Sequence, residues 1–135
     1  MAFIYQRITI MNLRKPGHEN LNDKLQWIGN SLGLFSVRDK DKSCYRIFIE
    51  LLKSAKKKAP LTSDEVASRL QLSRGTVIHH LTKLIEAGIV VHEGNHYLLR
   101  VDNLNDLIGE MEKDIKRITE DVKEIATEVD RLLGL

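Results

Sequence analysis

The sequence predicts a mainly α chain (α+β) in which a small β component lies between helical segments. Several segments repeat apolar residues at helical spacing, two β-rich runs surround Gly94, and the C-terminal part carries an unbroken heptad pattern. With 135 residues, of which 42% are hydrophobic, the chain has room for one compact domain plus an extension.

The first 42 residues are expected to form an extension that consists of a strand and a short helix. Phe3 to Met11 is rich in β-branched and aromatic residues that alternate with polar ones, a pattern typical of a strand. A helix is expected from Leu21 to Leu32, and Gly33 would end it. The strand has three open roles: adding to the sheet of the hairpin over residues 89–101, exchanging between subunits, or forming part of an effector pocket with the Trp27 segment.

Residues 43–101 are expected to form the central domain, which begins with a helix whose N-cap is Ser43. The lysine run Lys56–Lys58 ends this helix, where positive charge suits the negative end of the helix dipole. Such a run is usually a solvated helix end, and contact with a DNA backbone is the alternative.

Two further helices and a hairpin follow. Thr62 and Glu65 have the spacing of a capping box, and Ser73 is expected to cap a helix that runs to Ala87 and stops at Gly88. The stretch "IVVHEGNHYLLRV" then predicts a hairpin over residues 89–101, with Gly94 in its turn. Helix, helix, turn, helix and hairpin in this order make the winged helix-turn-helix arrangement.

The helix after Ser73 has an apolar face and a polar face. At about 100° per residue, Val77, Leu81 and Leu84 point toward a core. The opposite side carries a polar ridge with His80 on its flank: Gly75, Thr76, His79, Lys83 and Glu86. A helix that enters the major groove needs short hydrogen-bonding groups near its start and basic groups for phosphates. The ridge is therefore a candidate DNA interface.

Three roles compete for the adjacent His79 and His80. A metal site is disfavoured, because neighbours on a helix point in different directions and no further ligand lies three or four residues away. No nucleophile or carboxylate partner for general-base catalysis is visible, so we predict no enzyme activity. Surface contact with a base edge or phosphate remains the simplest role. For His80, the alternative is a half-buried ring that packs against a neighbour.

Two more histidines flank the hairpin turn. Across a tight hairpin the His92 and His96 rings are able to approach each other, and with Glu93 they offer metal ligands. Hairpin tips rarely supply a rigid ligand shell. We therefore interpret them as polar residues of the hairpin, predict no metal or other cofactor, and expect Arg100 to contact phosphate.

The stretch "LSRGTVIHHLTKLIEAGIV" resembles the recognition helix and turn of ArsR-type winged-helix regulators, in which Thr-Val-x-x-His-Leu-x-x-Leu-x-x-Ala-Gly recurs. "LTSDEVASRLQLS" is similar to the preceding helix of that family and of the MarR type. The resemblance covers roughly residues 43–100. It implies a helix at or near DNA, with the hairpin as wing. The contact residues are then Ser73, Arg74, Gly75, Thr76, His79, His80 and Lys83, to which we add His96 and Arg100 of the hairpin. Metal sensing is not implied, because the family's cysteine motif is missing and Cys44 stands alone.

Residues 102–135 are expected to form a coiled-coil dimerisation helix. Steps of four and three residues join its apolar positions, which are Leu104, Ile108, Met111, Ile115, Ile118, Val122, Ile125, Val129 and Leu132. The flanking positions are acidic and offer no interhelical bridge, which favours a parallel or splayed homodimer. The alternatives are packing against its own domain or docking on a basic surface.

Charge and composition set the remaining bounds. The formal net charge of +2 divides into +3 for residues 1–42, +4 for 43–101 and −5 for 102–135. We expect neither a signal peptide nor a membrane span, and the single cysteine fits a reducing cytoplasm, where the protein would lie with the nucleoid. The leading hypothesis is a homodimeric, sequence-specific, double-stranded DNA-binding transcriptional regulator. The alternative is a winged-helix protein-interaction subunit of a transcription or chromosome assembly.

Overall fold

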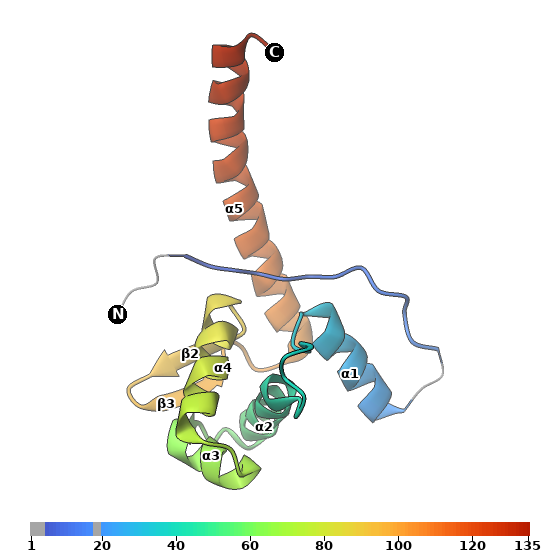
Figure 1. Ribbon diagram of the computed structural model, residues 1–135, viewed down its shortest axis with the longest axis vertical. Helices are drawn as coiled ribbons and strands as arrows, with labels where there is room; N and C mark the ends of the chain where they lie inside the picture. Colours follow the sequence, from blue (N-terminus) through green and yellow to red (C-terminus); the bar gives the residue numbers. More distant parts are fainter. Residues whose placement is uncertain (1–4, 18–19) are drawn as a thin grey trace.

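The structure, a computed structural model, describes residues 5–17 and 20–135. Its five helices and three short strands follow the predicted order closely. They are α1 (Leu21–Ser31), α2 (Ser43–Lys57), β1 (Leu61–Thr62), α3 (Ser63–Leu70), α4 (Arg74–Glu86), β2 (Val90–Glu93), β3 (His96–Leu99) and α5 (Leu104–Leu133). In Figure 1, α5 rises out of a compact body formed by the other elements, and the N-terminal segment crosses its lower part.

The helix starts are fixed by side-chain caps. Asn20 accepts a hydrogen bond from the Asp23 amide at the start of α1, as Ser73 does from Thr76 at the start of α4. The capping box of Thr62 and Glu65 at the start of α3 is confirmed with both of its hydrogen bonds present. These caps satisfy amides that have no partner within the helix.

The prediction that Ser43 is the N-cap of α2 is wrong, because Lys42 holds that position and Ser43 is the first residue of the helix. The Asp39 carboxylate accepts from the amides of Ser43 at 2.9 Å and Cys44 at 3.0 Å. An acceptor from the preceding turn thus replaces the capping hydroxyl, and Ser43 is buried inside the helix.

The hairpin is confirmed, and it gains a third strand. β3 lies in the middle of an antiparallel sheet of order β1-β3-β2, with Leu61 opposite Tyr97 and Val90 opposite Leu99. Gly94 in the turn has a φ of +61°, a conformation that glycine adopts without strain. The short β1 ties the hairpin to the segment that leads into α3.

The core lies between the helices and the inner face of this sheet. Its fully buried side chains include Ile47, Phe48, Leu51, Val66, Val77, Leu81, Leu84, Ile89, Leu107 and Met111. All three apolar positions expected on the inner face of α4 are among them. The core therefore fixes which side of α4 points outward.

The strand predicted for Phe3 to Met11 is wrong over the part that the structure describes. Residues 5–11, here called the strap, lie outside any strand, and the remainder of that prediction falls outside the described residues. The Arg7 amide donates to the Glu86 carbonyl at 2.9 Å, and the Met11 amide donates to the Ser31 carbonyl at 2.7 Å. The β-type alternation thus produces an extended chain that docks on helix ends rather than on a strand edge.

The heptad pattern of α5 divides into two parts. Met111, a predicted dimerisation residue, is fully buried in the protein's own core together with Leu107. Beyond Ile118 every residue is exposed, including Val122 and Val129. The prediction of one continuous seam for a partner is therefore wrong near the domain. Leu107 lies outside the heptad positions, and together with Met111 it turns this part of α5 toward the domain core. About two heptads, roughly 22 Å of helix, remain exposed.

No helix among residues 5–17 and 20–135 is both long enough and apolar enough to cross a membrane.

Candidate nucleic-acid interface

The outward face of α4 begins with a rigid, uncrowded first turn. Ser73 Oγ accepts from the Thr76 amide at 3.1 Å and donates to Thr76 Oγ1 at 2.8 Å, so the two hydroxyls hold each other in place. At Gly75 an added Cβ would meet nothing within 4 Å. Another molecule can therefore approach this end of the helix closely, where amides and the helix dipole favour negative groups.

Basic side chains and an imidazole ring follow on the outward face of α4. Arg74, His79 and Lys83 are exposed. Arg74 Nε lies 3.5 Å from an Asp64 oxygen, but both side chains are 74% exposed. An exposed pair of this kind contributes little stability. Arg74 is therefore free to exchange its partner for a phosphate.

The structure removes His80 from this face. Its ring is buried, with Nε2 at 3.9 Å from an Asp39 oxygen, and its Nδ1 has no hydrogen-bond partner among the described residues. Burial lowers the pKa of His80, while the charge of Asp39 acts in the opposite direction. The surface contact predicted for His80 is wrong, and the packing alternative describes it better. His79, the next residue back, points outward.

A cleft of about 820 Å³ lies between α4 and the loop that precedes α2. Thr76 and Lys83 line one side of it, and Arg38 and Lys40 line the other. The exposed basic residues of this loop lie across the cleft from α4, together with the acidic Asp39 and Asp41. Sequence reasoning missed the loop, because its alternating charges indicate only a solvated segment and not which helix it lies beside.

Two residues of the outward face were also missed. Ile78 is 36% exposed and Thr82 is exposed, and both lie beside His79 on the helix surface. The Thr82 hydroxyl donates to the Ile78 carbonyl at 2.8 Å. The same helical geometry that placed Gly75 and His79 outward was sufficient to find them.

The register of the hairpin keeps its two histidines apart. His92 is opposite Tyr97 and Glu93 is opposite His96, so His92 and His96 point to opposite faces of the ribbon. The expected approach of their rings is therefore wrong. His92 instead stacks on Tyr97 with 4.3 Å between ring centroids, and His96 is exposed. The described residues contain no cluster of three or more potential metal ligands.

Arg100 points into the domain rather than toward the outer surface of the hairpin. Its guanidinium binds both carboxylate oxygens of Asp114 on α5, with one N–O distance of 3.1 Å, and lies 3.7 Å from Glu110. The Asp114 side chain is only 3% exposed, and the hydrogen bond from Arg100 lowers the pKa of Asp114. The predicted phosphate contact of Arg100 is wrong, because the buried carboxylate holds this side chain.

Comparison with known protein families supports this architecture. Residues 41–93 match a family described as a helix-turn-helix domain. This chain contains a winged helix-turn-helix domain. The match covers α2 to β2, and domains of this type indicate DNA-binding transcription regulation and are typically not enzymes. Searches of curated proteins and of solved structures gave no significant match.

Proposed function

We propose that the protein is a sequence-specific regulator of transcription that binds double-stranded DNA as a homodimer. In this proposal α4 enters the major groove, the hairpin of residues 89–101 acts as the wing, and the protein lies with the nucleoid. The observation that carries the proposal is the outward face of α4, which is polar and uncrowded on a helix whose opposite face is fully buried.

Each group on this face has a distinct task. Thr76 and His79 have the hydrogen-bonding groups to contact base edges, and the space at Gly75 allows the helix to approach them. Arg74 and Lys83 bind phosphates and set the orientation of the helix on the duplex. His96 on the exposed edge of the hairpin contacts the backbone beside the groove.

The exposed part of α5 supplies the dimer contact. Val122, Ile125, Val129 and Leu132 are between 44% and 76% exposed and repeat at heptad spacing. An apolar stripe of this kind is stabilised when a second copy covers it. Because only about two heptads are available, we expect a weak dimer that two adjacent half-sites on DNA reinforce. Their centres would lie about one helical turn apart, or a multiple of that.

A gel-shift assay on a selected duplex tests the assigned face. We expect Thr76→Ala and His79→Ala each to weaken specific binding roughly tenfold, since a base contact contributes about 1–3 kcal/mol of discrimination. His92→Ala is the matched control, because His92 is also exposed but stacks on Tyr97 on the hairpin. If both α4 variants bind as tightly as the wild type, the assigned face is wrong.

A protein-interaction module is the second candidate, and the exposure of Ile78 on the outward face favours it. An exposed apolar side chain at the edge of a polar ridge suits a protein partner as well as a thymine methyl group. In this case the ridge would contact protein, and α5 would pair with a different chain. Sedimentation at low concentration together with the gel shift separates the two functions. A monomer without affinity for DNA supports the interaction module.

A further inference from the structure

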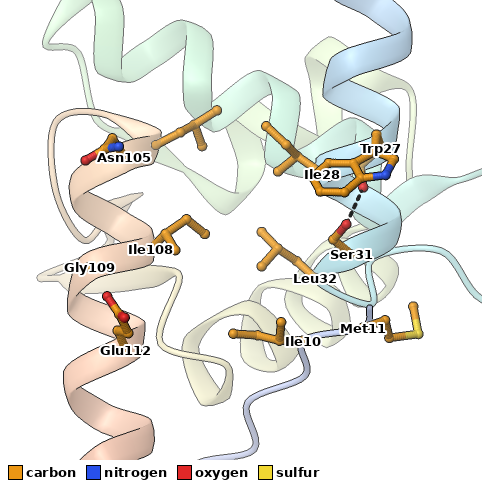
Figure 2. Close-up of a pocket in the computed structure, with 11 residues that line it drawn as sticks. Ile10, Met11, Trp27, Ile28, Ser31, Leu32, Asn105, Ile108, Gly109 and Glu112 are labelled. Atoms are coloured by element: carbon orange, nitrogen blue, oxygen red, sulfur yellow. Dashed lines mark hydrogen bonds between the residues drawn. The ribbon is translucent and has the colours of Figure 1, made fainter. Parts of the chain in front are cut away.

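An apolar cavity of about 580 Å³ lies where the strap, α1 and α5 meet. Figure 2 shows Ile108 of α5 facing Ile28 of α1 and Leu32, the residue that follows α1, while Ile10 and Met11 of the strap lie along a third side. Ile10, Met11 and Ile108 are 53%, 42% and 38% exposed although all three are apolar. The volume lies within the range of about 300–1,000 Å³ that small-molecule sites occupy.

The polar groups on the α1 side of the cavity are already engaged within the protein. Trp27 Nε1 donates to the Arg14 carbonyl at 2.7 Å, and Ser31 Oγ donates to the Trp27 carbonyl at 2.8 Å. This side therefore offers an occupant an indole ring and aliphatic groups. On the α5 side, Glu112 lines the cavity and makes no ion pair with any residue that the structure describes. A ligand with an apolar body and a hydrogen-bond donor at one end would therefore match the apolar α1 side and the Glu112 carboxylate.

Gly109 is a second indication of a binding site. It lies inside a 30-residue helix, where glycine destabilises by about 1 kcal/mol relative to alanine, and it lines the cavity. An added Cβ at Gly109 would meet nothing within 4 Å, and its backbone is helical. Neither packing nor backbone conformation requires a glycine here. Its effect is to leave the cavity wall open.

We propose that this cavity binds a ring-containing apolar small molecule that carries an N–H donor, neutral or cationic. The indole of Trp27 stacks on the ring, the aliphatic side chains of α1 and α5 enclose it, and Glu112 accepts the hydrogen bond.

The strap links this cavity to α4. Ile10 and Met11 line the cavity, while Tyr5 Oη donates to a Glu86 carboxylate oxygen at 3.1 Å at the C-terminal end of α4. Between them, Gln6 donates to the buried Asp114 at 3.2 Å and accepts from Arg117 at 2.6 Å. A ligand that moves residues 10–11 therefore pulls on the end of α4. This consequence, unlike ligand binding itself, rests on the proposed DNA-binding function.

The dye N-phenylnaphthylamine tests the site, because it is a neutral ring compound with an N–H donor. Trp27 is the single tryptophan of the chain, so its emission reports occupancy of the cavity directly. We expect saturable binding that quenches and shifts this emission. The sulfonated analogue anilinonaphthalene sulfonate should bind at least about tenfold more weakly, because its negative charge faces Glu112. Glu112→Gln should reduce that difference.

Variants at Gly109 decide whether the dye occupies this cavity. Gly109→Leu should lower the affinity by roughly tenfold or more by filling the space, whereas Gly109→Ala, which adds only a Cβ, should change it less than about twofold. Glu120→Leu, on an exposed part of α5 outside both the cavity and the apolar stripe, should have no effect. Circular dichroism establishes that each variant is folded. If Gly109→Leu does not fold, the comparison of the two dyes on wild type and Glu112→Gln still decides the proposal.

Two results would overturn the site: equal affinity of the two Gly109 variants, or an unchanged Trp27 emission at saturating dye. A gel shift with dye-saturated protein tests the link to α4. Dye binding without any change in DNA affinity refutes the link alone. Absence of DNA binding by the dye-free protein refutes the proposed function and leaves the ligand site standing.

Discussion

Arg100→Ala should destabilise the protein far more than the removal of a typical surface charge. Asp114 is only 2% exposed, and Arg100 binds both of its carboxylate oxygens. Removal of one partner leaves the other as a buried charge without compensation, which costs about 3–5 kcal/mol. Because Arg117 also lies 3.3 Å from Asp114, we expect the lower end, about 3 kcal/mol.

Thermal unfolding followed by circular dichroism at pH 7 measures this effect. For a chain of this size, about 3 kcal/mol corresponds to a fall in Tm on the order of 10 °C. Arg117→Ala is the matched control, because it removes another arginine from the same carboxylate but one whose side chain is 59% exposed. Its cost should stay below about 1 kcal/mol. The double variant Arg100→Ala/Asp114→Leu should recover most of the loss, since it removes the buried charge as well.

The pH dependence supplies a second test of the same pair. Arg100 lowers the pKa of Asp114 in the folded protein, so the pair contributes stability above the unfolded pKa of about 3.9. This contribution disappears as the pH falls through the lower folded pKa. The difference in Tm between wild type and Arg100→Ala should therefore narrow below about pH 4. Equal melting of Arg100→Ala and Arg117→Ala at pH 7 would refute the reasoning.

Three further predictions concern His80, α5 and the charge of the interface. Burial lowers the pKa of His80, so the unfolded chain takes up protons first and the wild type should lose stability from pH 7 to 5.5. Melting curves of His80→Leu should show a smaller loss, and those of His79→Leu, an exposed neighbour, the full loss. Met111→Ala should lower the free energy of unfolding in urea by about 2–5 kcal/mol, because this side chain is fully buried. Val129→Asp should weaken self-association in sedimentation and leave the stability of the domain unchanged. If Met111→Ala affected only self-association and Val129→Asp only stability, the division of α5 into a core part and an exposed part would be wrong. Lys83→Ala should reduce the dependence of DNA affinity on salt concentration by about one unit of log–log slope, and an unchanged slope would exclude a phosphate contact at this residue.

Sequence patterns predicted the elements whose signals are local. The caps at Thr62 and Ser73, the stop at Gly88 and the turn at Gly94 each depend on neighbouring residues, and the structure confirms them. Helical periodicity also placed His79 outward. Propensity and periodicity suffice where one side of an element is buried and its ends carry their own capping groups.

The errors arose where a distant residue decides the outcome. Asp39 lies beside His80, which is far from it in the sequence, and Asp114 holds Arg100, fourteen residues earlier in the chain. The Ser43 cap failed for a local reason instead, because the carboxylate of Asp39, four residues earlier, takes its place. The strand predicted for the strap was wrong for a related reason. Alternating apolar and polar residues predict an extended chain, but they do not show whether another strand lies next to it. For α5, a heptad pattern shows which side is apolar but not whether a second copy or the protein's own core covers it. The cavity beside Trp27 was no more than one of three open roles for the N-terminal segment.

Selection of bound duplexes from a random pool, with sequencing of the enriched pool, tests the central claim most directly. If the outward face of α4 reads DNA in a homodimer, the wild type should enrich two related half-sites about one helical turn apart, or a multiple of that. Combined Thr76→Ala/His79→Ala protein should lose the enrichment while keeping its fold. A pool that the wild type leaves unchanged, at low salt and at a protein concentration where the dimer forms, would contradict the account.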